Sequence, residues 1–543
     1  MKSGEMCVLL CHISAVRVDK SNTILNIMNG KIRIWALGAA MMVGTMCTDL
    51  CAERLVILST NDTHSQIVPD AANQGGILRR RALVDSIRGA EKNVLLLDAG
   101  DAVQGTVFFN MFRGEVEFAM LDSLGYDACI MGNHEFDNGM EILSDLYRKM
   151  RTPLLSANYQ LTGTPLEGLT QPYIIKEFAG RRIGVVGINL LPEGMIAPEN
   201  SVGVQYANAA EIADLVAEYL KRVEHVDFVI ALTHIGYSGG KDNNPTDNMI
   251  VQRSRFIDMV VGGHSHTTID PSSAKSEPAF IKNADGRDVL VTQTGSKGRK
   301  LGYTAIDLDR MAVECYKLLP VDSRYDDLAG SYAGMKQFLA PYQEKVDSLM
   351  NHTVCHTAEA MANSSMQAWN LVGDVAYEIA TKNSGIKIDM AIMNAGGIRQ
   401  SFPKGAVSEG LINSMFPFRN NLVVLEMTGQ QLLDALAVMG GRGGDIVSRQ
   451  CFVEYARQGT AKPAKILKAT INGKAIDPDK TYHVATLDYL ANGGDYMEPM
   501  THCKWLYSDK KQFGERMLEY AKALEAKGKK LKADGKRRMV KKQ

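Results

Sequence analysis

Short apolar runs alternate with longer stretches of helical pattern from Leu55 onward. The runs at residues 55–58, 94–97 and 228–232 have the length and composition of buried strands. Strands that alternate with helices are typical of a layered α/β domain. Between residues 323 and 350 the pattern becomes charged, and its apolar residues recur at helical spacing. We expect a connector with its own helix there.

Polar residues follow five of these apolar runs directly. Ligands of layered sheets bind beyond the carboxyl ends of the strands, so we expect the five turns to converge on one site. The glycines at positions 100, 132, 262 and 263 predict sharp turns there. A single cluster would be explained by turn formers or packed imidazoles, whereas the set indicates a functional site. The clusters are Asn61-Asp62-Thr63-His64, Asp98-Ala99-Gly100-Asp101, Gly132-Asn133-His134-Glu135, Thr233-His234 and Gly262-Gly263-His264-Ser265-His266.

Length and charge limit the number of domains and the kinds of partner that we expect for this protein. A chain of 543 residues is too long for one core and predicts two or three domains. Lys plus Arg and Asp plus Glu are both 61, so no overall positive field favours a nucleic-acid partner. Basic residues do gather from Lys527 to Lys542, where Asp534 is the one acidic residue, and we expect a solvated tail.

The N-terminal region has the pattern of a signal peptide. Lys31 and Arg33 precede an apolar run at 34–46, and Ala52 is suited to a cleavage site. The run is too short to span a bilayer stably, which favours cleavage over a membrane span. We therefore expect a periplasmic or secreted protein, with Met28 as an alternative start.

Cysteine usage gives no disulfide framework. Large residues before Cys47 and Cys51 disfavour lipoprotein anchoring. The five cysteines after position 52 are scattered and odd in number, so no pairing can be inferred from them.

The second half carries a different set of motifs. An apolar run at 390–393 enters Asn394-Ala395-Gly396-Gly397-Ile398-Arg399. Phe416-Pro417-Phe418-Arg419-Asn420 follows, and then the segment from Asp488 to Asp495. An arginine fork matches a phosphate or carboxylate, and two aromatic rings can stack on a planar base. An acidic side chain can accept hydrogen bonds from sugar hydroxyls.

These motifs resemble a known family. The first half resembles the calcineurin-like metallophosphoesterases, with the order Asp-x-His, Gly-Asp, Gly-Asn-His-Glu, His and Gly-His-x-His. From about Arg54 to about Tyr520 the chain resembles the bacterial periplasmic 5′-nucleotidases and UDP-sugar hydrolases. This resemblance implies a layered α/β metallophosphoesterase sandwich, with a second α+β substrate-specificity domain that rotates about the connector.

The same resemblance implies domain boundaries. We expect the signal region at 1–52, the metallophosphoesterase domain at 53–322, a helical linker at 323–350, the 5′-nucleotidase C-terminal domain at 351–520 and a basic tail at 521–543.

It also implies two divalent metal ions and their ligands. One metal would be held by Asp62, His64, Asp101 and His266, and the other by Asp101, Asn133, His234 and His264, with Asp101 as the bridge. His134 would be a non-ligand imidazole near the scissile phosphate, oriented by Asp137. Two cations roughly 3.5–4 Å apart suit phosphate-ester hydrolysis because they stabilise the attacking and leaving oxygens. Oxygen and nitrogen ligands without thiolate suit Mn, Zn, Fe or Co.

For the second domain the resemblance implies substrate contacts. Arg399 would bind the substrate anion, Phe418 and Tyr489 would stack on the base, and Asn420 and Asp495 would contact base and sugar. Phe418 and Tyr489 also have the alternative role of core aromatics.

Several positions depart from the family pattern. Ala395 replaces the first glycine of its loop, Tyr496 follows Gly-Gly-Asp directly, and Arg419 replaces a usual glycine. Residues 362–367, where the family places arginines, contain none. These changes bear on nucleotide specificity and leave the metal ligands intact.

The prediction is a 5′-nucleotidase that converts nucleoside 5′-monophosphates to nucleoside and phosphate. Hydrolysis of UDP-sugars, 2′,3′-cyclic nucleotides or 3′-nucleotides at the same metals is the alternative. A surface binding protein without turnover is the second alternative, and the intact ligand set argues against it.

Overall fold

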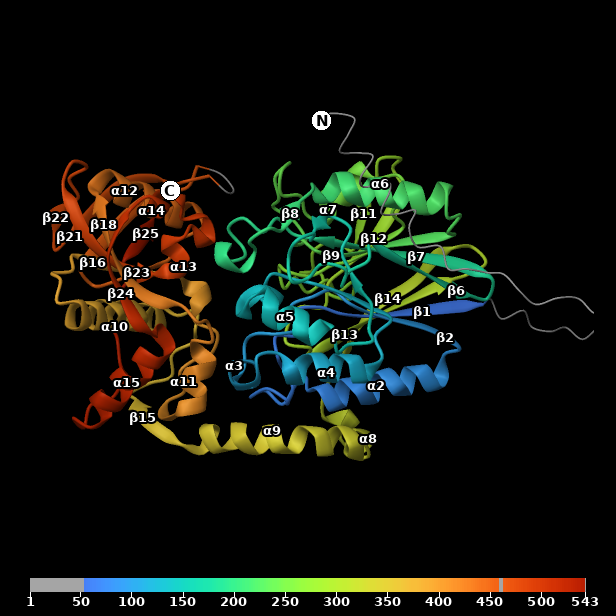
Figure 1. The fold of residues 1–543 in the computed structure, drawn as a ribbon, viewed down its shortest axis with the longest axis horizontal. Coiled ribbons are helices and arrows are strands. Elements are labelled where there is room, and N and C mark those ends of the chain that lie inside the picture. The colour runs from blue at the N-terminus through green and yellow to red at the C-terminus, as the bar shows by residue number, and fades with distance from the viewer. Residues whose placement is uncertain (1–52, 459–461, 543) are drawn as a thin grey trace, which may run out of the picture. The chain divides into compact units, whose positions relative to one another are not determined.

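Two six-stranded sheets contain the apolar runs of the first half (Figure 1). The computed structural model describes residues 53–458 and 462–542, so the expected signal region at 1–52 lies outside the described residues. Residues 52–543 belong to one compact unit.

The first sheet is parallel at its centre and antiparallel at one edge. β1, β2, β3 and β4 run parallel, and β13 and β14 pair antiparallel beside β1. Its strands in order are β14 (Ala312–Pro320), β13 (Lys300–Asp307), β1 (Arg54–Thr60), β2 (Asn93–Asp98), β3 (Ala128–Ile130) and β4 (Leu154–Leu155).

The second sheet also has a parallel centre, formed by β7, β9, β10 and β12. Its order is β11 (Phe280–Lys282), β12 (Asp288–Thr292), β10 (Met259–Val261), β9 (Phe228–His234), β7 (Arg181–Asn189) and β6 (Tyr173–Phe178). β3 contacts both β7 and β9, so the two sheets pack against each other as the predicted sandwich requires. Their parallel strands therefore end at a shared edge. A small pair, β5 (Tyr159–Gln160) with β8 (Gln205–Tyr206), lies outside both sheets.

Helices bury the outer faces of these sheets. Leu83 of α2, Phe118 of α4 and Leu143 of α5 share a buried cluster with Leu96 of β2. α6 starts at Asn208, whose side chain accepts hydrogen bonds from the Ala210 and Glu211 amides. The helices are α2 (Ile77–Ala90), α3 (Val107–Phe112), α4 (Glu115–Leu124), α5 (Met140–Tyr147), α6 (Ala209–Arg222) and α7 (Asp247–Arg253).

The connector is helical. α8 (Asp326–Gly330) and α9 (Ala333–Asn351) cover the stretch with helical spacing. Leu339 and Val346 of α9 are buried against the core of the first half, and Tyr342 Oη donates to Glu115 Oε1 at 2.7 Å. This packing ties the helix to the metal-bearing half.

The second half is built on a five-stranded mixed sheet with both faces covered. Leu422 and Val424 of β18 face the cluster under α10 and α15, while Val423 and Leu425 face the cluster under α12. This alternation is what a strand buried on both faces requires. The strands in order are β19 (Ile446–Val447), β16 (Met390–Met393), β23 (Thr481–Leu487), β18 (Asn421–Thr428) and β24 (Lys504–Gln512).

Two smaller sheets and six helices complete this half. β22 (Lys474–Ala475), β21 (Lys465–Ile471), β20 (Cys451–Ala456) and β25 (Met539–Lys541) form one sheet, and β15 (Thr353–Thr357) pairs with β17 (Gly405–Ser408). The helices are α10 (Met366–Ser384), α11 (Glu409–Met415), α12 (Gly429–Gly441), α13 (Asp488–Ala491), α14 (Glu498–Thr501) and α15 (Phe513–Glu525).

The expectation of a solvated basic tail at 521–543 is wrong for its described residues. α15 continues to Glu525, Leu531 is fully buried, and Met539–Lys541 pair with β20 as a parallel strand. Arg538 forms a two-pronged ion pair with Asp374 at 2.7 and 2.9 Å. The sequence did not predict this ordered structure, because Leu531 and Met539 lie among mostly basic and polar residues and show no periodicity.

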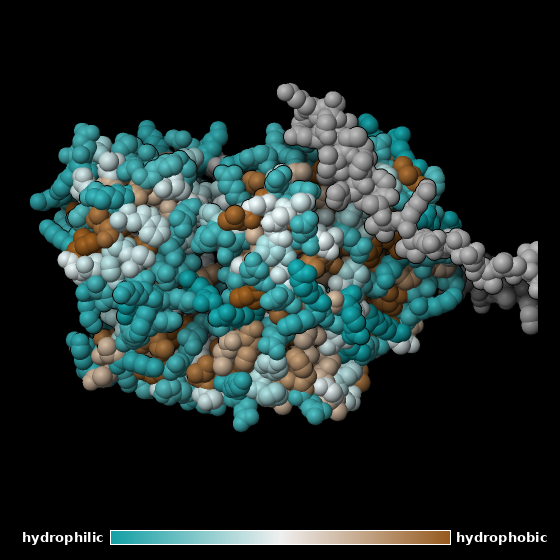
Figure 2. Space-filling model, in the orientation of Figure 1, coloured by the Kyte–Doolittle hydropathy of each residue, from teal (hydrophilic) through white to brown (hydrophobic). Residues whose placement is uncertain are grey.

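Within the described residues, none of the helices is both long and apolar enough to cross a bilayer. The face seen in Figure 2 is largely hydrophilic, and its hydrophobic residues occur in small separate groups.

Candidate active site

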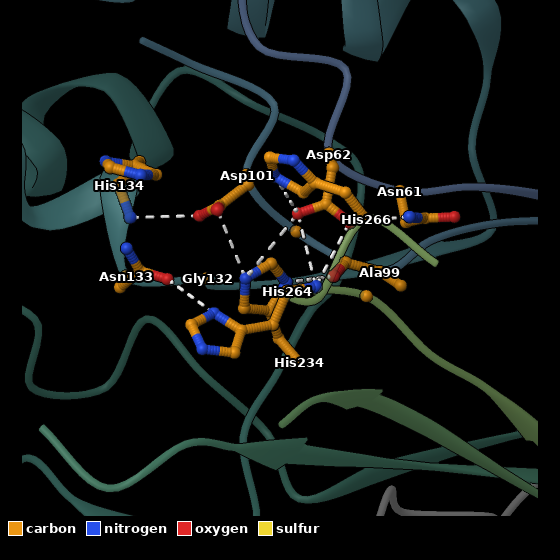
Figure 3. A network of polar contacts seen from close by, with 12 residues as sticks. Asn61, Asp62, Ala99, Asp101, Gly132, Asn133, His134, His234, His264 and His266 are labelled. Carbon is orange, nitrogen blue, oxygen red and sulfur yellow. Dashed lines mark hydrogen bonds and ion pairs between the residues drawn. The ribbon is translucent and has the colours of Figure 1, made fainter. Parts of the chain in front are cut away.

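The seven side chains predicted to bind metal converge where the two sheets end, and Figure 3 labels all of them except His64. The ligand atoms of Asp62, His64, Asp101 and His266 all lie within 4.8 Å of one another. Asp62 and His64 follow β1, Asp101 follows β2, Asn133 follows β3, His234 ends β9, and His264 and His266 follow β10.

Several of these atoms face each other in pairs that hydrogen bonds alone do not satisfy. His234 Nδ1 lies 2.6 Å from the carbonyl oxygen of Ala99 and donates to it, which leaves Nε2 as an acceptor. That Nε2 is buried without a hydrogen-bond partner among the described residues and lies 3.2 Å from Asp101 Oδ2. Lone pairs aimed at one another in a buried site are the arrangement that a cation resolves.

The remaining ligand pairs are equally close. His64 Nε2 lies 2.8 Å from His266 Nε2, and His264 Nδ1 lies 3.0 Å from Asn133 Oδ1. Asp62 and His234 have exposed fractions of 0%, so both donors are withdrawn from water. The donor set of carboxylate, imidazole and amide oxygen therefore fits two divalent ions.

The backbone at these ligands is unusual. Asp62, His64, Asp101, His264 and His266 all have positive φ, between 47° and 78°. Non-glycine residues rarely adopt this region, and it persists only where the surroundings impose it. The strain concentrates at the strand ends that carry the ligands.

The glycines near the metal ligands are needed mainly because other groups pack closely against them. Of the four expected to make sharp turns, Gly100 has a positive φ, at 84°. A Cβ on Gly132 would lie 2.2 Å from Asp101 Oδ1, which is impossible without displacing the ligand. Besides the turn expected there, the site needs the lack of a side chain at Gly132.

Two residues that the sequence reasoning did not assign hold the ligand loops in place. Glu135 accepts hydrogen bonds from the amides of Asp101 at 3.0 Å, Gly132 at 2.6 Å and Ala102 at 2.8 Å. Asn61 Nδ2 donates to Asp62 Oδ2 at 2.5 Å, and its Oδ1 accepts from the amide of Thr294 at 2.8 Å. Both residues belong to the strand-end clusters, and this position in the sequence could have indicated that they support the site.

His134 lies beside the ligands. Its Nδ1 lies 2.9 Å from Asp137 Oδ2, and its Nε2 lies 2.9 Å from an Arg399 nitrogen. A guanidinium can only donate, so Nε2 accepts and Nδ1 carries the proton towards Asp137. Burial disfavours the charged imidazole, but the carboxylates of Asp137 and Asp101 outweigh it and raise the pKa of His134.

One cavity of about 480 Å³ joins the metal ligands to the second half. All five side chains predicted to bind substrate line it, together with six residues of the metal end. The first group is Arg399, Phe418, Asn420, Tyr489 and Asp495, and the second is Asp101, Asn133, His134, Asp137, His264 and His266.

Arg399 connects the two ends of this cavity. Its guanidinium carbon lies 5.1 Å from the centre of the Phe418 ring, in cation–π range. Its Nε is buried without a hydrogen-bond partner among the described residues. Burial lowers the pKa of this guanidinium, against the opposing effect of Asp137 and Asp101. A half-buried cation with an unused donor is suited to an incoming anion.

The aromatic end is held by a short network around Asp495. The Asp495 amide donates to Tyr489 Oη at 3.2 Å, and Asn394 Nδ2 donates to Asp495 Oδ2 at 3.0 Å. A nitrogen of Arg442 lies 3.0 Å from the same oxygen. A Cβ on Gly494 would lie 2.5 Å from the Tyr489 ring, which explains the glycine before Asp495.

Asn394 and Arg442 were missed from sequence. Asn394 lines the cavity, and its Oδ1 is buried without a partner within the part of the chain that the structure describes. Its place at the start of the Asn-Ala-Gly-Gly-Ile-Arg motif could have indicated it. Arg442 lies in no motif, so only the fold reveals its contact with Asp495.

The residues that depart from the family pattern make identifiable contacts in the structure. Ser365 caps α10 by accepting from the Ala368 amide, and Asn363 Nδ2 donates to the Ile398 carbonyl at 3.1 Å. The arginine-free stretch therefore supports the loop that carries Arg399. Arg419 lines the cavity, and Tyr496 takes a φ of 62° with its ring against Gly194.

Known families match both halves of the chain. Calcineurin-like phosphoesterase matches residues 55–268, and the 5′-nucleotidase C-terminal domain matches residues 351–502. The protein is a calcineurin-like phosphoesterase with a 5′-nucleotidase C-terminal domain. This confirms the resemblance and the fold class inferred from the motifs.

Relatives cover both domains. The chain is 28% identical over 478 residues to Protein UshA of Escherichia coli, covering 81% of this chain and 86% of that protein. It is 29% identical over 499 residues to the 5′-nucleotidase of Rattus norvegicus, covering 81% and 83%. The crystal structure of the 5′-nucleotidase precursor from Thermus thermophilus matches with a TM-score of 0.77 and 27% identity, covering 90% and 99%.

Another relative is much longer. The trifunctional nucleotide phosphoesterase protein YfkN of Bacillus subtilis is 27% identical over 494 residues, and the match spans 32% of its length.

The phosphoesterase is thus a metal-dependent phosphoric-ester hydrolase that uses two divalent ions. When bound, such ions neutralise phosphate charge and activate the attacking water.

Proposed function

We propose that this protein is a 5′-nucleotidase that hydrolyses nucleoside 5′-monophosphates to nucleoside and phosphate. The observation that carries the proposal is one cavity lined both by metal ligands and by two aromatic side chains, Phe418 and Tyr489. A nucleoside monophosphate has the matching pair of features, an anionic ester and a planar base. The names of the rat and Thermus thermophilus relatives support the same substrate class.

The metal ligands have the roles that the resemblance implies. Asp62, His64, Asp101 and His266 would hold one ion, and Asp101, Asn133, His234 and His264 would hold the other. The loops behind them are fixed through Glu135 and Asn61, so the ligands are arranged before substrate arrives.

His134 and Arg399 act on the phosphate group. Asp137 holds the His134 imidazole by its Nδ1 proton, which directs Nε2 into the cavity. Arg399 moves its free donor to a phosphate oxygen, where a charge-assisted hydrogen bond anchors the substrate. Once Arg399 has turned to the phosphate, Nε2 of His134 no longer accepts its hydrogen bond and can take up a proton from solvent. The imidazolium then stabilises the charge that develops on the transferring group and gives its Nε2 proton to the leaving oxygen.

The base and sugar occupy the other end. Phe418 and Tyr489 stack on the base, Asn420 contacts its edge, and Asp495 accepts from the sugar hydroxyls. Asn394 and Arg442 hold the Asp495 carboxylate in place, since both donate to it. We place the first domain at 53–322 and the linker at 323–350, and we extend the second domain beyond the expected limit of 351–520, because α15 runs to Glu525 and Met539–Lys541 pair with β20.

Hydrolysis of UDP-sugars, cyclic nucleotides or 3′-nucleotides at the same metals is the second candidate. The specific observation in its favour is the absence of arginines at 362–367, which leaves fewer cations for a terminal phosphate. The name of the Bacillus subtilis relative, a trifunctional nucleotide phosphoesterase, is compatible with other phosphate esters. A non-catalytic binding protein is disfavoured because every predicted metal ligand is present.

The test is phosphate release from a substrate panel. Nucleoside 5′-monophosphates, UDP-glucose, 2′,3′-cyclic AMP, 3′-AMP and phenyl phosphate would be compared with Mn²⁺, Zn²⁺, Co²⁺ and Mg²⁺ added to metal-free protein. The highest kcat/KM should belong to the 5′-monophosphates. A higher value for a UDP-sugar or a cyclic nucleotide would select the second candidate, and no release from any ester would leave a binding protein.

Export from the cytoplasm is part of the proposal. It is supported by the charged and apolar pattern before Ala52. Fractionation of cells that express the full chain, followed by N-terminal sequencing of the mature protein, would locate it and identify the cleavage site.

A further inference from the structure

A loop of the metal-bearing half reaches the base end of the cavity. This crossing loop, residues 190–200, follows β7. The carbonyl oxygen of Gly194 accepts from the Asp495 amide at 3.3 Å and from Tyr489 Oη at 3.4 Å. Asn200 Nδ2 donates to the Asp137 carbonyl at 3.4 Å. The loop is therefore anchored at both ends of the substrate cavity.

The crossing loop also supplies part of the cavity wall. Met195, Ala197, Glu199 and Asn200 line it alongside the aromatic residues of the second half. Met195 and Ala197 offer apolar surface to any ring held there. Glu199 is the charged member of this group, and its side chain is exposed.

Glu199 differs from the other carboxylates at this end. Asp488 already accepts from the amides of Asn421 at 3.0 Å and Tyr489 at 2.8 Å. Asp495 already accepts from Asn394 at 3.0 Å. Glu199 therefore presents an exposed carboxylate to the space beside the rings, where an incoming donor can reach it.

The position of Glu199 relative to the rings follows from Asp488. Asp488 directly precedes Tyr489, and both line the cavity. Burial and, to a smaller extent, the carboxylate of Glu199 raise the pKa of Asp488, against the hydrogen bonds from its two amide donors. Glu199 and Asp488 thus line the same cavity, and Asp488 directly precedes one of the proposed stacking residues. An N–H group placed beside them would relieve this repulsion.

We propose that Glu199 is a specificity residue that accepts a hydrogen bond from an amino group on the edge of the nucleobase. The inference rests on the proposed function and extends it to the choice of base. An ionised carboxylate is an acceptor only, so it pairs with an exocyclic amino group and repels a keto oxygen. The enzyme should therefore prefer cytosine over uracil and adenine over hypoxanthine.

These base pairs isolate the contact. Within each pair the bases have the same ring size and exchange an amino group for a keto group, and the neighbouring ring nitrogen changes from an acceptor to an N–H donor. A carboxylate at the exocyclic position therefore favours the amino base, whereas one at the ring nitrogen would favour the keto base. Both stack similarly on aromatic rings, and both nucleotides carry the same phosphate. A preference within a pair therefore reports on hydrogen bonding at the base edge. Because Glu199 is exposed to solvent, we expect about three- to tenfold rather than the larger factors of buried polar contacts.

The test measures kcat/KM for CMP, UMP, AMP and IMP with metal-loaded enzyme. Wild type should favour CMP over UMP and AMP over IMP by about three- to tenfold. Glu199→Gln keeps the size of the side chain and can donate as well as accept, so the ratio should fall to near one in at least one pair. The change should appear in KM, while kcat and phenyl phosphate hydrolysis stay as in wild type.

Glu193→Gln is the matched control. Glu193 lies on the same loop, is exposed and does not line the cavity, so its neutralisation removes the same charge without touching the base. It should leave both ratios unchanged. Glu199→Ala should reproduce the loss of selectivity and guard against a new contact made by the glutamine amide.

Two results would overturn the inference in different ways. If Glu199→Gln changes all four nucleotides equally, the carboxylate acts only by repelling the anionic substrate, and the inference is wrong while the nucleotidase function stands. If wild type hydrolyses phenyl phosphate and none of the mononucleotides, the proposed function itself fails and the inference with it.

Discussion

The two ends of the substrate cavity are built in different ways. The metal end is formed by one half of the chain, at the ends of parallel strands whose positions the sheets fix. The base end combines three segments of the second half with the crossing loop of the first. Chemistry therefore depends on one rigid framework, whereas recognition depends on contacts between elements that are distant in sequence.

This difference predicts which substrates each substitution should affect. Loss of a metal-end residue should affect every phosphate ester equally, because every ester needs the same charge neutralisation. Loss of a base-end residue should affect only substrates that carry a base. Parallel kinetics on a mononucleotide and on phenyl phosphate measure the two effects separately.

The largest effect is expected for Asp101→Ala. Asp101 is the carboxylate assigned to both metals, and its exposed fraction is 1%. Its loss should reduce hydrolysis of both substrates to background and lower the metal content measured by mass spectrometry. Near-normal phosphate release from a folded mutant would contradict the ligand assignment.

His134→Ala should separate catalysis from metal binding. His134 contacts Asp137 and Arg399 and is not assigned as a ligand. We expect kcat to fall by ~10²–10⁴ for both substrates, the range for loss of an acid–base group. Metal analysis should still find two ions. His225→Ala, at an exposed histidine outside the cavity lining, is the control and should be silent.

Arg399→Ala should have a smaller effect on both substrates. Removing a charge-assisted hydrogen bond costs about 1.5–3 kcal/mol, which corresponds to roughly 10- to 100-fold in kcat/KM. Both esters should suffer because both carry the phosphate group that Arg399 is proposed to bind. An effect confined to the nucleotide would place Arg399 at the base instead.

Tyr489→Ala should have the smallest effect and the most selective one. Loss of stacking of about 1 kcal/mol raises KM for a nucleotide roughly fivefold. Phenyl phosphate has no base to clamp at this site and should be hydrolysed almost as by wild type. Tyr489→Phe keeps the ring and should restore most of the nucleotide affinity. Equal damage to both substrates would identify Tyr489 as a core aromatic whose loss disturbs the fold.

The metal end could be predicted from sequence because its signal is local. Each ligand follows an apolar run, and a parallel strand order brings the ends of such runs together. Gly132 and Glu135 belong to one of the clusters that follow an apolar run, although the sequence did not indicate their roles. Gly132 is required by its distance to Asp101, which only a folded chain defines.

The base end could be predicted only in part. Its motifs located Arg399, Phe418 and Tyr489, but Arg442 reaches Asp495 from outside any motif. The sequence did not indicate a role for Glu199, because it lies in the first half, whose motifs predict the metal site. Contacts across the two halves depend on how the domains pack, and no local pattern encodes that packing.

The strand Met539–Lys541 has a consequence for biosynthesis. It completes the sheet that begins at Cys451, and the preceding Arg538 neutralises Asp374 of α10. A nascent chain lacks both contacts until residue 541 has been synthesised. Domains generally fold as units from the N-terminal side as they are made, so the metal-bearing half is complete while the recognition half still waits for its edge strand. A ribosome stalled shortly before residue 538 would thus display a finished dimetal framework beside an unfinished nucleoside clamp.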